Sequence, residues 1–114
     1  VPFRGPVSWL HAGEVASAFI RAVSKDLTGA PVFDINGVAT TVEDSMAVLR
    51  SIAPQAKIEV SGEALPFPMS LSDEPVRKHL GNYGNVPLSE GIASTYRAFQ
   101  ALIARGSLSS SNVN

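Results

Sequence analysis

The two histidines are the most versatile candidates for chemistry, since an imidazole can bind a metal, accept a proton or contact a ligand. His11 lies three residues before Glu14, a spacing that permits an acid/base pair or a weak ligand pair. A histidine at a helix start beside a solvated glutamate explains the same spacing. His79 follows Arg77 and Lys78, which is typical of a solvated helix face. Because neither histidine has a partner at His-x-x-x-His spacing, we predict no metal site.

Other residue types exclude further chemistry. The chain contains no cysteine, which rules out disulfides, thiolate zinc sites and a cysteine nucleophile. Its serines are not part of a nucleophile motif with a nearby base, so we expect no serine hydrolase. Its arginines are scattered and no glycine cluster opens a helix beside them, so no phosphate cradle is predicted. The sequence therefore predicts no catalytic residue.

Three further positions are candidates for ligand contact. Asp34 and Asn36 flank Ile35 in a predicted strand that ends at Gly37. Polar side chains at the carboxyl end of a strand can line a ligand crevice, although Asn36-Gly37 is also ordinary turn chemistry. Trp9 precedes the first predicted helix, where it either stacks on a ligand or packs the strand against the helix.

Length and composition describe the molecule that must position these residues. With 114 residues, 45% apolar and 17% charged, the chain fits one globular domain and is not typical of a disordered protein. The formal net charge of -1 favours neither a nucleic acid nor an anionic membrane as partner. No apolar run reaches the roughly 20 residues of a membrane-spanning helix, and we recognise no signal peptide. We therefore expect a cytoplasmic location.

Hydrophobic periodicity predicts four helices. The first is expected over about 12–24 with one buried stripe, and the second over 42–52, where Thr41 begins a start that resembles a capping box. A short third helix is expected over 73–80, stopped by Gly81 in a left-handed conformation.

The last predicted helix has the clearest pattern. We expect Ser89 to cap it and Gly106 to end it. One apolar face should pack into the core, and it consists of Ile92, Tyr96, Phe99 and Ile103. Residues 107–114 are rich in serine and asparagine, which predicts a disordered tail.

Two apolar runs predict strands, at 31–37 and 57–61. With the helix between them they have the size of a βαβ unit, although the sequence leaves open whether they pair. Residues 65–69 form an apolar loop that its prolines make rigid. The fold class is thus α/β, or an α+β-like fragment of it, with about four helices and two or three short strands.

Five short motifs follow one another in the chain, at Val7–Phe19, Pro31–Gly37, Thr41–Asp44, Asp73–Gly81 and Pro87–Ile92. In this order they resemble the C-terminal part of the NAD-dependent epimerase/dehydratase family, the extended short-chain dehydrogenases/reductases. The resemblance covers about residues 5–105. It implies that residues 1–106 correspond to the last strand and helix and the C-terminal substrate-binding subdomain of such an enzyme.

The resemblance also implies what this chain lacks. Members of the family bind NAD or NADP through a Gly-x-x-Gly-x-x-Gly turn and transfer protons with a Tyr-x-x-x-Lys pair, and neither motif occurs here. We therefore expect no cofactor on this chain and no catalysis by it alone. Because the chain opens on Val1 rather than Met and lacks a dinucleotide-binding domain, we interpret it as a fragment.

In the family, this half contributes to the substrate pocket, and many members act on nucleotide sugars. The resemblance and the residue types together lead us to expect ligand contacts from Trp9, His11, Asp34, Asn36, Pro66 and Phe67, with Pro66–Met69 as an apolar wall. Many nucleotide-sugar epimerases clamp the diphosphate with an arginine after the strand expected at 57–61. Residues 62–66 contain no arginine, which weakens the expectation of a nucleotide sugar.

The alternative interpretation is a stand-alone interaction or structural module. Apolar surface on the first helix and on the 32–35 strand, which a Rossmann domain normally covers in the family, would then be buried by self-association. The expected assembly is a homodimer or a larger oligomer. A self-sufficient small enzyme has no nucleophile, base or metal constellation to support it.

Overall fold

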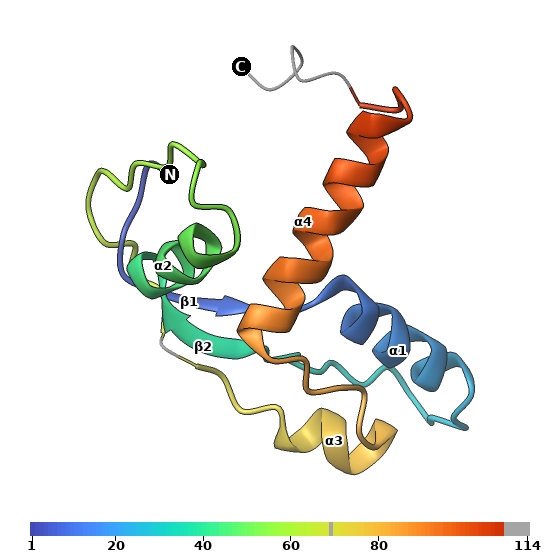
Figure 1. The fold of residues 1–114 in the computed structure, drawn as a ribbon. Coiled ribbons are helices and arrows are strands. Elements are labelled where there is room, and N and C mark those ends of the chain that lie inside the picture. The colour runs from blue at the N-terminus through green and yellow to red at the C-terminus, as the bar shows by residue number, and fades with distance from the viewer. Residues whose placement is uncertain (69, 109–114) are drawn as a thin grey trace.

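The computed structural model describes residues 1–68 and 70–108. These residues form a small mixed α+β domain with four helices and one two-stranded antiparallel sheet (Figure 1). In chain order the elements are β1 (Pro6–Trp9), α1 (Ala12–Val23), β2 (Val38–Thr41), α2 (Val42–Ile52), α3 (Glu74–Leu80) and α4 (Leu88–Ala104). No described helix is long and apolar enough to cross a membrane.

The β1–β2 ribbon connects the two halves of the molecule. Its strands are antiparallel, with Trp9 opposite Val38. Just before β2, Gly37 lies so close to β1 that a Cβ there would overlap the Trp9 carbonyl oxygen. Ser8 Oγ accepts from the Gly37 N–H (3.0 Å) and lies 2.8 Å from Asn36 Oδ1, to which it donates. A glycine is therefore required where the chain enters the second strand.

The four predicted helices are confirmed, with shifts of a residue or so at their ends. Thr41 caps α2 as expected, because its Oγ1 accepts from the Asp44 N–H (3.1 Å). Gly81 ends α3 with a positive φ of 80°, although its ψ of -166° is extended rather than left-handed helical. The prediction that Ser89 caps α4 is wrong. The cap position belongs to Pro87, whose ring holds φ at -59°, so that Ser89 already lies in the first turn.

The two predicted strands do not form. Residues 31–37 have no regular secondary structure and no partner strand in the described chain, and the second strand of the sheet begins only at Val38. At 57–61 the carbonyl oxygens bind arginine side chains instead of a strand: Ile58 O accepts from Arg50, and Val60 O from Arg4. The predicted βαβ unit is therefore replaced by the antiparallel β1–β2 pair.

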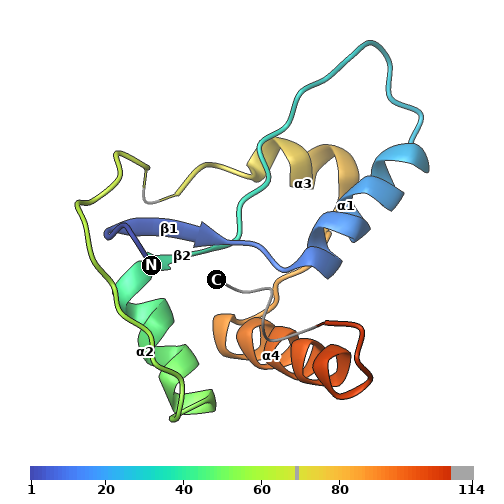
Figure 2. The same ribbon diagram turned by 90° about the horizontal axis from the view of Figure 1, so that it is seen from above.

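The helices fall into two pairs on either side of the ribbon (Figure 2). α1 contacts α3, and α2 contacts α4. Between α1 and α3 lies a small core, made of Ala18, Val76, Leu80 and Tyr83, with Leu10, Leu27, Phe33 and Ile35 packed against it. On the other side, Val42, Met46 and Ala53 of the α2 region are buried.

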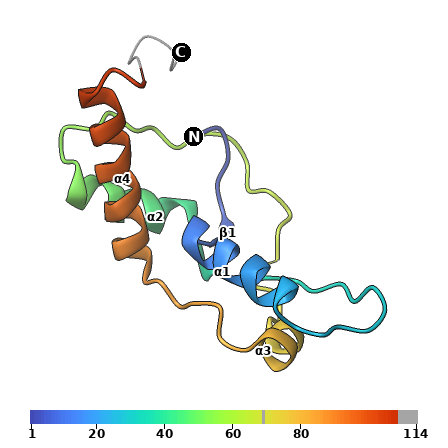
Figure 3. The ribbon, with the colours of Figure 1, turned by 90° about the vertical axis from the view of Figure 1, so that its right-hand side faces the viewer.

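The apolar stripe predicted to be buried on α1 is largely exposed. Phe19 and Val23 are 67% and 84% exposed, and the side of α1 that is buried instead carries Glu14 and Ala18. The connection at 24–37 projects beside α1 and α3, and its Val32 is 92% exposed (Figure 3). We call Phe19, Ile20, Val23 and Val32 the α1 apolar face.

The apolar face of α4 also differs from the prediction. No residue of α4 is fully buried, and Phe99 and Ile103 are about half exposed. Beyond α4, the Ser107 N–H donates to Leu102 O (2.9 Å) and closes the helix end. The rest of the predicted tail, from residue 109, lies outside the described residues, as does Met69 of the predicted apolar wall.

Candidate functional site

A cavity of about 610 Å³ lies between α2 and α4, with the end of β1 and the start of α1 at its base. This volume is within the range of sites that bind small organic molecules. The lining comes from four parts of the chain and includes Trp9, Leu10, His11, Met46, Leu49, Ile92, Thr95, Tyr96 and Phe99. The site is thus assembled from the N-terminal, middle and C-terminal parts of the described chain.

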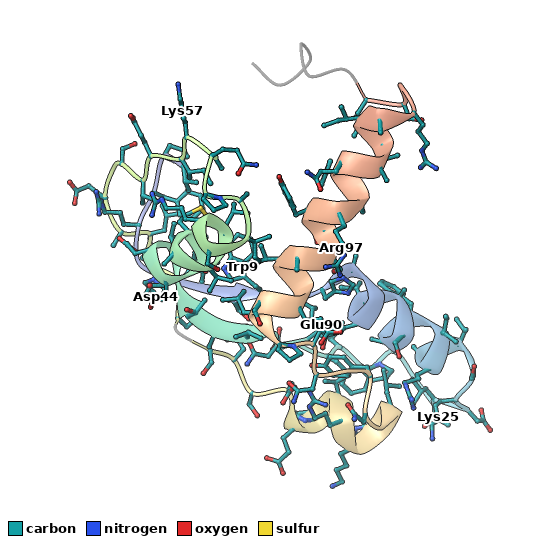
Figure 4. All side chains as sticks on the ribbon, in the orientation of Figure 1. Trp9, Lys25, Asp44, Lys57, Glu90 and Arg97 are labelled. Atoms are coloured by element: carbon teal, nitrogen blue, oxygen red, sulfur yellow. The ribbon has the colours of Figure 1, made fainter. Side chains whose placement is uncertain are left out.

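Trp9 is fixed at the base of this cavity. Its indole Nε1–H donates to Ser45 Oγ (2.6 Å), and Ser45, which is fully buried on α2, donates in turn to Thr41 O (2.7 Å). The indole remains 40% exposed, and Figure 4 shows it between α2 and the first turns of α4. The edge of Trp9 thus holds β1 against α2 while its ring lines the cavity, and stacking of this ring on a ligand stays a prediction.

His11 occupies the N-cap of α1. Its Nδ1 accepts from the Gly13 N–H (3.1 Å), so the proton of the neutral ring is on Nε2. Nε2 lies 3.1 Å from Ser94 Oγ on α4, and Ser94 donates to Gly91 O (2.9 Å). Both ring nitrogens are engaged, and the ring joins the start of α1 to α4 at the edge of the cavity.

Glu14 is buried rather than solvated, at 6% exposure. Its carboxylate does not pair with the imidazole of His11. Instead Oε2 accepts from the His11 backbone N–H (3.1 Å) and Oε1 from the Val86 N–H (3.0 Å). Buried charges need such partners. Glu14 therefore ties the segment before α4 to the start of α1, and it holds two sides of the cavity together.

A second polar cluster, missed at the level of sequence, surrounds Tyr83. This side chain is 2% exposed, and its Oη lies 2.8 Å from Asp73 Oδ2 and 3.0 Å from Asn36 O, and accepts from the Asn36 N–H (3.3 Å). The same Asp73 oxygen accepts from Arg77 Nε (2.6 Å), whose guanidinium lies 4.5 Å from the centre of the Tyr83 ring. The four residues attach the 31–37 segment to α3.

The protonation of this cluster fits a structural role. Partial burial raises the pKa of the Asp73 carboxyl, but hydrogen bonds from Tyr83 and Arg77 and the charge of Arg77 outweigh it, so the pKa is lowered. Burial, together with the hydrogen bond to Asp73, raises the pKa of the Tyr83 hydroxyl. Both shifts favour an ionised aspartate beside a neutral tyrosine, and neither group is left reactive.

The six predicted contact residues do not form one site. Trp9 and His11 line the cavity together. Asn36 and Phe67 line a separate hollow of about 290 Å³. The two remaining residues are exposed and line neither space: Asp34 and Pro66.

Tyr96 and Phe99 were assigned to the core from the helical periodicity, yet they line the cavity. Tyr96 Oη accepts from the side-chain amides of Gln55 (3.1 Å) and Gln100 (3.0 Å).

Among the described residues, no group of three or more histidine, aspartate or glutamate side chains could hold a metal ion. Comparisons of the chain with protein-family models, with curated proteins and with solved structures find no match.

Proposed function

We propose that this chain is the substrate-binding part of an enzyme of the extended short-chain dehydrogenase/reductase kind, and that it is not catalytic alone. The observation that carries the proposal is the 610 Å³ cavity with Trp9 and His11 at its base. The ordered motifs of the sequence support the family, and the four helices with their ribbon would correspond to its C-terminal subdomain. The α+β class itself does not depend on this assignment.

The fixed side chains around the cavity support a binding role. Trp9 is held by Ser45, and His11 by Gly13 and Ser94, before any ligand arrives. A site whose groups are already ordered loses less conformational entropy on binding. The rigid base of the cavity is therefore suited to recognise one ligand shape.

The residues of this chain do not fit a dinucleotide. The cavity lining contains no charged side chain, and no glycine-rich turn of the sequence opens a helix toward it. In the proposed enzyme, NAD or NADP would be held by a separate dinucleotide-binding domain. Catalysis would then require both parts.

The cavity is tested by filling it. Thr95 and Ala98 are both exposed on α4, but only Thr95 lines the cavity. Thr95→Phe should block the site, while Ala98→Phe adds the same side chain outside it. We expect calorimetry to find a small molecule that binds wild type and Ala98→Phe but not Thr95→Phe, in a panel of nucleoside-diphosphate sugars and uncharged aromatics. If no member of the panel binds wild type, the proposal fails.

A second candidate function is self-association as a homodimer or larger oligomer. It is favoured by the α1 apolar face, whose residues are between 65% and 92% exposed. A second copy that covered this face would remove a large apolar area from water. The two functions are compatible, because the α1 apolar face and the cavity involve different residues.

A further inference from the structure

The chemistry of the cavity wall restricts the ligand further. Most of the lining is aliphatic or aromatic, with Leu10, Met46, Leu49, Ile92 and Phe99 among it, and no Asp, Glu, Lys or Arg contributes. A diphosphate carries charge that needs cationic or several N–H partners once it leaves water. The lining supplies no such cation.

The polar groups at the base of the cavity do not replace one. Trp9 Nε1 already donates to Ser45, and both ring nitrogens of His11 are engaged. The helix starts beside the cavity carry acidic residues, Glu14 in the first turn of α1 and Glu90 in that of α4. These carboxylates already neutralise the positive end of each helix dipole, so neither helix start favours a second anion.

One polar group of the lining differs from the rest. Tyr96 Oη accepts from Gln55 and Gln100, and no protein group within residues 1–68 and 70–108 accepts its own proton. A hydroxyl that accepts twice can still donate once. Because Gln55 and Gln100 are exposed and do not line the cavity, this hydroxyl lies at the cavity edge, where Tyr96 can give one hydrogen bond to a ligand oxygen.

From these observations we infer that the cavity binds an uncharged, largely apolar molecule with one hydrogen-bond acceptor, such as an aromatic carbonyl compound, and not a nucleotide sugar. The inference rests on the proposed function, because it names the ligand class of the same cavity. Apolar contact with the aromatic and aliphatic wall supplies the affinity, and Tyr96 orients the ligand.

Three probes separate the contributions. Coumarin is an uncharged aromatic lactone with a carbonyl acceptor, naphthalene has a similar shape without an acceptor, and UDP-glucose is a nucleoside-diphosphate sugar. We expect calorimetry to show coumarin binding that Thr95→Phe weakens at least about tenfold and Ala98→Phe leaves unchanged. Tyr96→Phe should weaken coumarin about fivefold, the loss of one hydrogen bond, and leave naphthalene unaffected. The affinity for coumarin should not depend on ionic strength.

The outcomes distinguish this inference from the proposed function. UDP-glucose binding that Thr95→Phe abolishes, without coumarin binding, would overturn the inference and keep the cavity as a substrate site. Equal losses for coumarin and naphthalene in Tyr96→Phe would overturn the role of the hydroxyl. If wild type binds none of the three probes, both the inference and the proposed function fail.

Discussion

Tyr83 joins segments that lie 47 residues apart, because one buried hydroxyl meets both Asn36 and the carboxylate of Asp73. Glu14 and His11 act similarly, each connecting the start of α1 to the region of α4. Among the described residues, no buried side-chain nitrogen or oxygen lacks a hydrogen-bond partner. At the scale of single residues, these polar side chains mainly connect helices and loops, including His11 and Glu14, which the sequence offers as candidates for chemistry.

Removing the Tyr83 hydroxyl should therefore destabilise the fold. Tyr83→Phe leaves the Asn36 N–H and the Asp73 carboxylate without this partner, and we expect a loss of about 1–3 kcal/mol in the free energy of unfolding. Urea unfolding measures it. Tyr96→Phe is the matched control, because its hydroxyl bonds only exposed glutamines, and it should change stability by less than about 0.5 kcal/mol. Equal losses in the two variants would contradict the role of Tyr83.

The lowered pKa of Asp73 gives stability a dependence on pH. A carboxyl whose pKa is lower in the folded than in the unfolded chain stabilises the fold above its unfolded value and loses that contribution as the pH falls. Wild type should therefore begin to lose this stability near pH 3.8, the ordinary value for this group, and lose the rest as the pH falls further through the lower pKa of the folded chain. Asp73→Asn, which cannot titrate, should start less stable and lose less over the same range in urea titrations. Parallel pH profiles for the two proteins would refute this.

At the scale of elements, the helices were predictable and the strands were not. The start of α2 is encoded locally, since Thr41 and Asp44 lie three residues apart and need no distant partner. A strand needs a partner strand, and the local sequence does not specify which distant segment that partner is. The 31–37 run has strand-like composition but no partner, whereas Val38–Thr41 pairs with β1 across about thirty residues. The sequence predicts part of the candidate site. It indicates Trp9 and His11 as contact residues, but the periodicity of α4 predicts a core position for Tyr96 and Phe99, which line the cavity.

The cap of α2 offers a test at this scale. Thr41→Ala removes the acceptor for the Asp44 N–H and should cost about 0.5–2 kcal/mol of unfolding free energy. Ser51→Ala, near the exposed end of the same helix, is the control, and thermal denaturation of the pair should show a clear difference. A stable Thr41→Ala variant would mean that the helix is held by packing alone.

At the scale of the whole molecule, two helix pairs meet mainly through the ribbon and the contacts of His11 and Glu14 (Figure 2). A chain of this size leaves much apolar side-chain area uncovered on α1 and α4. Such area favours association, and the partners that we propose for it are a dinucleotide-binding domain or a second copy.

Light scattering tests whether the chain associates with a second copy of itself. We expect wild type to show a mass above that of the monomer, and Val23→Glu to reduce it, because the charge would enter the apolar contact. Ser24→Glu adds the same charge one residue away, outside the α1 apolar face, and should preserve the assembly. A wild-type protein that stays monomeric at high concentration would contradict self-association.

α4 has no fully buried residue, and this affects its dynamics as well as its packing. Segments with few buried contacts open at a low free-energy cost, well before the molecule unfolds as a whole. α4 is such a segment, and it is also one side of the cavity. A ligand that contacts both α4 and α2 would hold this helix in place, and we expect it to slow amide hydrogen exchange along α4 more than along α2.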